Sequence, residues 1–155
     1  MMDEQAKQIL NSIHFLERFQ DLCDQYSFDL KESFENYDNQ KVLEILRDVG
    51  YTTPKYQKRE NFFQSIKMVD VYRFEHKIKT KGGIVELIWD VMKDNKYYMG
   101  NSFSNLEYYL YNPPKLRPLP IFRNYEDLRE ILTIAFQMHE DMTNEFLKVY
   151  GEPTG

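Results

Sequence analysis

The sequence predicts an α+β domain in which helices at both ends of the chain enclose a central antiparallel sheet. Three observations lead to this fold class. Apolar residues recur every three or four positions over 4–49 and again over 125–150. Between 62 and 100 they alternate with polar residues, and turn-forming residues separate these regions. The 155 residues match the length of one domain, so a single globular domain is expected over 1–155.

The region 4–49 is predicted to be helical. One apolar stripe runs over 10–26 and predicts a single first helix. Ser27 resembles an N-cap and predicts a second, short helix after it. The apolar positions of that second helix are Leu30, Phe34 and Tyr37. Asp38 or Asn39 is expected to cap a third helix, which ends at Gly50, the residue type that most often follows a helix.

The region 62–100 is predicted to be a β meander of about three strands. Its first strand is expected to place five apolar residues on one face. These are Ile66, Met68, Tyr72, Phe74 and Ile78. The turn at 80–83 contains two glycines and leads to a second strand with Leu87 and Trp89 on one face. Another turn at 93–95 precedes a third strand over 96–99.

After the meander, Ser104 and Glu107 have the spacing of a capping box and predict a short helix over 105–111. A fourth strand is the alternative, because Tyr108, Tyr109 and Tyr111 also suit a sheet. The segment 112–121 is rich in proline and is expected to be a loop. A long helix is then predicted over 125–150, with Asn124 as its N-cap.

The sequence predicts a cytoplasmic protein. The N-terminus lacks the basic start and apolar stretch of a secretory signal. No apolar run approaches the roughly 18 residues that a membrane span requires. The single cysteine, Cys23, cannot form an intramolecular disulfide, which fits a reducing compartment. Since Cys23 lies among apolar helix positions near Asp21 and Asp24, it is interpreted as a small buried side chain and not as a reactive thiol.

The sequence contains no recognisable motif for catalysis, a cofactor or a metal. No Gly-rich phosphate loop or nucleophile elbow is present. The three histidines, His14, His76 and His139, do not have zinc-ligand spacing. His139 is expected at a solvated corner of the last helix, and His76 in the core or at a sheet edge. No cofactor, metal site or catalytic residue is therefore predicted.

Charge is distributed unevenly along the chain. Residues 1–40 contain nine acidic and three basic residues, a net charge of −6, whereas residues 41–123 carry a net charge of +6 and residues 124–155 one of −5. Five acids of the first segment recur every three to five positions. They are Asp21, Asp24, Asp29, Glu32 and Glu35. Such a row is most often a solvated surface that favours solubility, and the functional alternative is a docking surface for a basic partner.

Tyrosines form a second concentration of interest. Four of them stand as consecutive pairs, Tyr97-Tyr98 and Tyr108-Tyr109. Core packing accounts for most tyrosines of this kind. However, neighbouring residues of a strand point to opposite faces, so part of each strand pair must be exposed. Exposed tyrosines are common at the energetic centres of protein interfaces. These four residues are therefore candidate partner-binding residues, together with the five acids.

The charge pattern and the tyrosines predict a non-enzymatic protein-binding module. Its specific form would be an acidic inhibitor, similar in role to an immunity protein, that neutralises a basic partner such as a bacterial nuclease toxin. One alternative is a small enzyme with a dispersed site at Tyr72, Glu75 and His76. Another is a subunit of a homo-oligomer or a larger complex. Nucleic-acid binding is disfavoured, because the pI is about 5.3.

Overall fold

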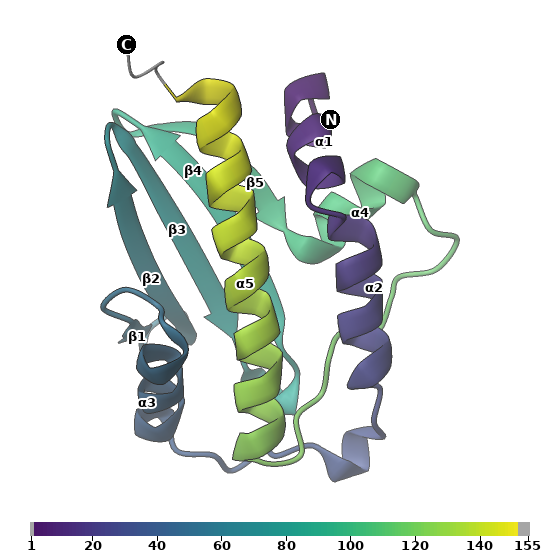
Figure 1. Ribbon diagram of the computed structural model, residues 1–155. Helices are drawn as coiled ribbons and strands as arrows, with labels where there is room; N and C mark the ends of the chain where they lie inside the picture. The colour runs from purple at the N-terminus through teal and green to yellow at the C-terminus, as the bar shows by residue number, and fades with distance from the viewer. Residues whose placement is uncertain (1, 152–155) are drawn as a thin grey trace.

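The chain folds into a five-stranded antiparallel sheet that helices cover on one face (Figure 1). The computed structural model describes residues 2–151. The helices are α1 (Glu4–Ser12), α2 (Phe15–Gln25), α3 (Asn39–Val49), α4 (Phe103–Tyr111) and α5 (Tyr125–Tyr150), with 3-10 turns η1 (Leu30–Glu32) and η2 (Lys81–Gly83). The strands are β1 (Lys55–Gln57), β2 (Phe62–Val69), β3 (Tyr72–Lys79), β4 (Glu86–Lys93) and β5 (Lys96–Ser102), in sequential order. The predicted α+β class is confirmed.

Helix α5 organises the covered side of the sheet. It runs along the sheet between α3 and the pair α1 and α2, and it contacts all three (Figure 1). The predicted bounds 125–150 are confirmed, and Asn124 Oδ1 accepts a hydrogen bond from the Asp127 amide at 2.8 Å. One stripe of α5 is fully buried: Leu128, Ile131, Leu132, Ala135, Met138, Met142 and Phe146. Neither α5 nor any other helix within residues 2–151 is long and apolar enough to cross a membrane.

The first predicted helix is in fact two helices. The apolar stripe over 10–26 is real, but α1 ends at Ser12 and α2 begins at Phe15. The break lies at His14, whose backbone is left-handed with φ 57°. Ile13, just before it, is buried. Because no glycine or proline marks the break, the periodic pattern alone could not reveal it.

The predicted helix after Ser27 is wrong. Only the three-residue turn η1 forms there, and Leu30 is 60% exposed. The apolar residues of this segment pack elsewhere: the Phe34 amide donates to the Phe122 carbonyl at 2.9 Å, and the rings of Phe34 and Tyr37 lie edge-on to Phe122. Contacts with a segment distant in sequence therefore replace the local helix.

The sheet has five strands where about three were predicted. The segment 62–78 is two strands, β2 and β3, joined by a two-residue turn at Asp70 and Val71. Asp70 has φ 58°, a conformation that aspartate tolerates better than most residues. The turn reverses the alternation, so Ile66 and Met68 lie on the opposite face from Tyr72. They belong to the open face of the sheet, the face that none of the helices within residues 2–151 covers.

Two further helices form close to their predicted positions. Helix α3 is confirmed: the Asp38 side chain accepts from the Gln40 amide, and Gly50 follows with φ 127°. A helix does form at 105–111, but it begins at Phe103. Its N-cap is Ser102, which accepts from the Asn105 amide at 3.2 Å, and not Ser104. Glu107 therefore does not act in a capping box.

Candidate functional site

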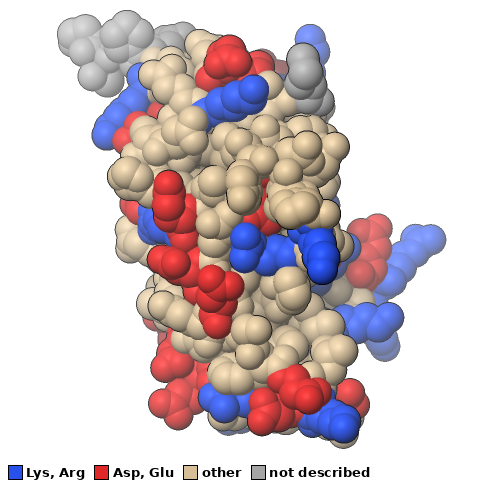
Figure 2. Space-filling model, turned by 90° about the vertical axis from the view of Figure 1, so that its right-hand side faces the viewer, with Lys and Arg blue, Asp and Glu red and all other residues tan. Residues whose placement is uncertain are grey.

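The five acids predicted as partner-binding residues are all exposed. Asp21 and Asp24 lie on the outer side of α2, and Asp29, Glu32 and Glu35 lie in and around η1, where the chain continues from α2. These five residues are called the acidic surface below. Figure 2, which looks onto the side of α2 and α4, shows red acidic atoms along its left and lower parts. The acidic surface thus runs from α2 into the η1 turn that follows it.

One of the five acids of the acidic surface is in an ion pair. Asp24 Oδ1 lies 3.6 Å from Arg117 Nη1. Within the part of the chain that the structure describes, no Lys, Arg or His nitrogen lies within 4 Å of the other four carboxylates. Asp29 uses one oxygen to cap η1, accepting from the Lys31 amide at 3.0 Å. The negative charge here is therefore available to a partner.

Two further acids, which were not predicted from the sequence as partner-binding residues, extend this surface. Glu17 is exposed one turn before Asp21 on α2, and its helical spacing could have identified it. Glu130 is an exposed residue of α5 whose carboxylate accepts a hydrogen bond from Tyr26 Oη at 3.0 Å. Since Tyr26 follows α2, this bond brings Glu130 beside the end of that helix. No sequence signal connects these two distant positions.

The four predicted tyrosines are also exposed, by 60% for Tyr97, 39% for Tyr98, 55% for Tyr108 and 37% for Tyr109. The side chains of Tyr97 and Tyr98 lie on different sides of β5, as expected, although a β-bulge contributes to this arrangement. Tyr97 pairs with Met92 on the open face, whereas Tyr98 is the extra residue of the bulge and packs edge-on against Phe146. Tyr98 is thus partly a core residue.

Helix α4 and the loop after it form an exposed aromatic patch. It consists of Tyr108, Tyr109, Tyr111 (54% exposed) and Leu116 (85% exposed). Figure 2 shows an uncharged tan area in the upper right part of the face, at the height where Figure 1 places α4. An apolar group as exposed as this aromatic patch is typical of an interaction surface.

A buried carboxylate holds the aromatic patch against the acidic surface. Glu107 of α4 is only 2% exposed, and its Oε2 accepts from Arg117 Nε at 2.9 Å and from Gln20 Nε2 at 3.1 Å. Arg117 also approaches Asp24, so one guanidinium connects the proline-rich loop with both α2 and α4. The two groups of exposed residues therefore form one continuous face of the molecule.

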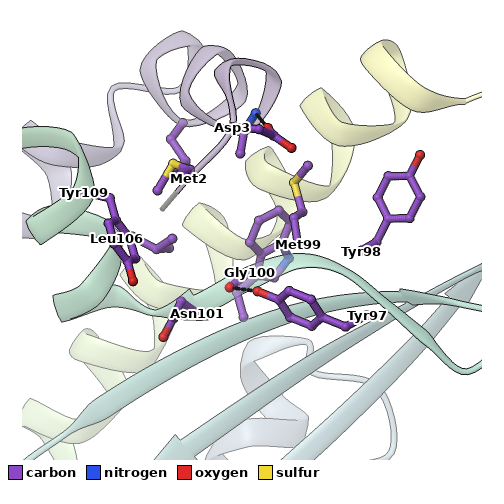
Figure 3. Close-up of a pocket in the computed structure, with 12 residues that line it drawn as sticks. Met2, Asp3, Tyr97, Tyr98, Met99, Gly100, Asn101, Leu106 and Tyr109 are labelled. Carbon is purple, nitrogen blue, oxygen red and sulfur yellow. Dashed lines mark hydrogen bonds between the residues drawn. The ribbon is translucent and has the colours of Figure 1, made fainter.

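A pocket of about 280 Å³ opens between α1, α4 and β5, beside this face. Figure 3 shows Tyr109 and Leu106 of α4 on one side, Tyr97 of β5 on the other, and Asp3 above. Gly100 lies at its base with φ 124°, and a Cβ there would overlap the Trp89 carbonyl oxygen. Any larger residue would therefore disturb the pocket.

The histidines that are buried form a stacked pair, and the solvated position predicted for His139 is wrong. His139 is fully buried, and its ring lies 4.0 Å from that of His76, which is 3% exposed. Burial, with the nearby Lys67 charge, lowers the pKa of His76 to about 3, and burial lowers that of His139 well below its usual value. Tyr51 Oη lies 3.0 Å from His139 Nδ1. Both rings are neutral core side chains at pH 7, as predicted for His76 alone.

The three residues of the enzyme alternative do not meet. His76 and Tyr72 are buried beneath the helices, whereas Glu75, between them in the strand, faces the open side of the sheet. Although Glu75 lies on the open face, its carboxylate is not solvated. It is 7% exposed, accepts from Gln64 Nε2 at 2.7 Å, and lies 3.6 Å from both Arg73 and Lys77.

Cys23 is 3% exposed, and burial raises the pKa of its thiol to about 12, in agreement with its interpretation as a core residue. Within residues 2–151, no group of three or more His, Cys, Asp or Glu side chains could hold a metal ion.

Comparison of the chain with protein-family models, with curated proteins and with solved structures finds no match.

Proposed function

We propose that this chain is a non-enzymatic protein-binding module whose acidic surface and aromatic patch bind one basic protein. Its specific form would be an inhibitor of the immunity type, which neutralises a partner such as a bacterial nuclease toxin. The observation that carries this proposal is the adjacency of unpaired carboxylates and exposed tyrosines on one face.

The unpaired carboxylates support electrostatic attraction. Asp24 pairs with Arg117 and Asp29 caps η1, whereas Asp21, Glu32 and Glu35 have no ion pair or side-chain hydrogen bond among residues 2–151, so these three do not serve the fold. A surface of one sign accelerates association with a partner of the opposite sign and disfavours wrong partners. A basic partner would also relieve the repulsion among these acids on binding.

The aromatic patch supports affinity. Tyrosine supplies a large contact area with few rotatable bonds and a hydroxyl for hydrogen bonding, and it is enriched among the residues that dominate binding energy. Tyr108 and Tyr109 already pack edge-on at 5.6 Å, so part of the ordering cost of binding is met in the free protein. A group of exposed tyrosines with charged residues at its border matches the anatomy of a specific interface.

Quantitative capture from the native cell tests the proposal with two matched triple variants. In the first, Asp21, Glu32 and Glu35 become Lys; Asp24 is left in place because it pairs with Arg117. In the second, the exposed acids Glu44, Asp48 and Glu60, which lie in or near α3 and β1, become Lys. This change breaks the exposed ion pairs of Glu44 with Lys41 and of Asp48 with Arg129, so thermal unfolding checks that the variant folds. The two variants have the same net charge, so a difference between them reports position and not total charge.

We expect the wild type and the second variant to capture the same basic protein in equal amounts, and the first variant to lose it. The captured protein should bind the wild type more weakly as the salt concentration rises. If both variants capture equally, or if no protein of basic pI is enriched, the proposal is wrong. A defined species of two or more copies of the chain would support the homo-oligomer instead.

A further inference from the structure

We propose that the pocket between α1, α4 and β5 receives an arginine side chain of the partner. This inference rests on the proposed function, because it names the group by which a basic protein would be anchored. Arginine is one of the residues most enriched at the energetic centres of interfaces, where it fills a pocket on the opposite surface.

The position of the pocket connects it with the proposed interface. Tyr109 belongs both to the aromatic patch and to the pocket lining, and Tyr97 lines the opposite side. Both rings are partly exposed, so a partner that covers the aromatic patch also covers the mouth of the pocket. A side chain that enters there would lie between two tyrosines.

The walls of the pocket suit a planar cation. Guanidinium groups stack on aromatic rings, and tyrosine faces attract cations. Tyr97 is held in place because its hydroxyl donates to the Gly100 carbonyl. The remaining wall is apolar and can contact the methylene groups of an arginine; it includes Met2, Leu10, Met99 and Leu106.

The charge of the pocket also favours a cation. Among the residues that line it, the ionisable carboxylate is that of Asp3, and no Lys or Arg is present. Asp3 Oδ1 accepts from the Ala6 amide at 2.7 Å as the N-cap of α1, which leaves its second oxygen for a ligand. An anionic side chain would be repelled by Asp3, since no Lys or Arg belongs to the described lining.

Trp89 Nε1 has no hydrogen-bond partner among the described residues, which alone would favour a ligand with an acceptor. However, less than 1 Å² of this nitrogen is exposed. A bound group therefore cannot reach it without a rearrangement, and the accessible chemistry is that of the tyrosines and Asp3.

The test uses two small probes that differ in charge and hardly in shape, N-acetyl-arginine amide and N-acetyl-citrulline amide. Trp89 is the single tryptophan of the chain and lines the pocket, so its fluorescence and its indole NMR signal report occupancy. We expect the arginine probe to bind with a Kd on the order of 1 mM, a usual strength for a ligand of this size. The citrulline probe should bind about tenfold more weakly, since it lacks the cation.

Two variants locate the binding. Asp3→Asn keeps an N-cap but removes the charge and should weaken the arginine probe about fivefold. Its matched control, Asp38→Asn, changes the N-cap of α3 and should leave binding unchanged. Ala6→Met adds volume to the lining and should abolish binding, with thermal unfolding as the check that the variant folds.

The outcomes separate this inference from the proposed function. Equal binding of the two probes, or a response to arginine that Asp3→Asn and Asp38→Asn share, would overturn the arginine site. So would the absence of a saturable response of Trp89. In any of these cases the capture experiment with the acidic variants still stands alone. Probe binding without a captured basic protein would instead retain the pocket and contradict the proposed function.

Discussion

The open face of the sheet and the acidic surface both carry many charges, but several of those on the open face are ion-paired, whereas most of those on the acidic surface are not. On the open face, Glu75 lies between Arg73 and Lys77 and accepts a hydrogen bond from Gln64. Opposite charges alternate there along β3, and Lys79 stands opposite Glu86 of β4. On the acidic surface, four of five carboxylates have no cation within 4 Å among residues 2–151. Paired charges serve the fold, whereas unpaired charges leave an electrostatic field for a partner.

The strongest test of this contrast through stability concerns Glu107, the carboxylate between the two groups of exposed residues. Glu107→Ala should lower the free energy of unfolding by about 3 kcal/mol, because it leaves Arg117 and Gln20 without their partner. Urea unfolding followed by circular dichroism measures the change. Glu107→Gln, which retains an acceptor, is the matched control and should cost less. Equal, small losses for both variants would show that this buried ion pair does not stabilise the face.

A third environment, beneath α5, sharpens the contrast because its titratable groups carry no charge. His76 has a pKa of about 3 in the folded protein and about 6.5 when unfolded. Between these values the unfolded state binds more protons, so stability is fully present above pH 6.5 and is lost as the pH falls toward 3. We expect His76 alone to cost about 2 kcal/mol at pH 5 relative to pH 7.5.

His76→Phe separates this contribution from that of other groups. Phenylalanine keeps an aromatic ring against His139 and removes two buried nitrogens that have no hydrogen-bond partner in the described part of the chain. The variant should therefore be close to the wild type at pH 7.5 and lose less stability at pH 5. Unfolding curves at both pH values provide the comparison. An unchanged pH dependence would mean that His76 is not a neutral core residue.

The smallest expected effect belongs to the acidic surface itself. Single changes of Asp21, Glu32 or Glu35 to the neutral amide should alter the free energy of unfolding by no more than about 0.5 kcal/mol, with a slight gain in stability. Thermal unfolding at low salt, where repulsion is strongest, is the appropriate measurement. Glu75→Gln on the open face is the reference that should destabilise. If the surface acids destabilise as much as Glu75→Gln does, the contrast between the two faces fails.

Local signals predicted much of this fold. The bounds of α5 and α3 were correct because a cap, an apolar stripe and a stop agreed in each of them. The turn at Asp70 was missed because it contains no glycine, and reading β2 and β3 as one strand placed Ile66 and Met68 on the wrong face. The segment after Ser27 was misassigned because its hydrogen bonds go to Phe122, a partner that periodicity cannot supply.

The candidate site was likewise predictable only in part from local signals in the sequence. The exposure of the acids and of Tyr108 and Tyr109 follows from spacing and helical geometry, which a sequence contains. The contacts that turn separate elements into one face do not. Glu107 reaches Arg117 and Gln20 across three elements, and His139 meets His76 from a helix and a strand distant in sequence. Only the folded chain brings such groups together.

The central claim is that the unpaired acids attract a basic partner, and the association rate constant measured against NaCl concentration tests it most directly. With the captured protein purified, we expect the wild type and the variant with Glu44, Asp48 and Glu60 changed to Lys to associate fast and to slow down steeply with salt. The variant with Asp21, Glu32 and Glu35 changed to Lys should associate about 10- to 1,000-fold more slowly at low salt, with a flat salt dependence. Equal rates and equal salt slopes for all three proteins would contradict the claim.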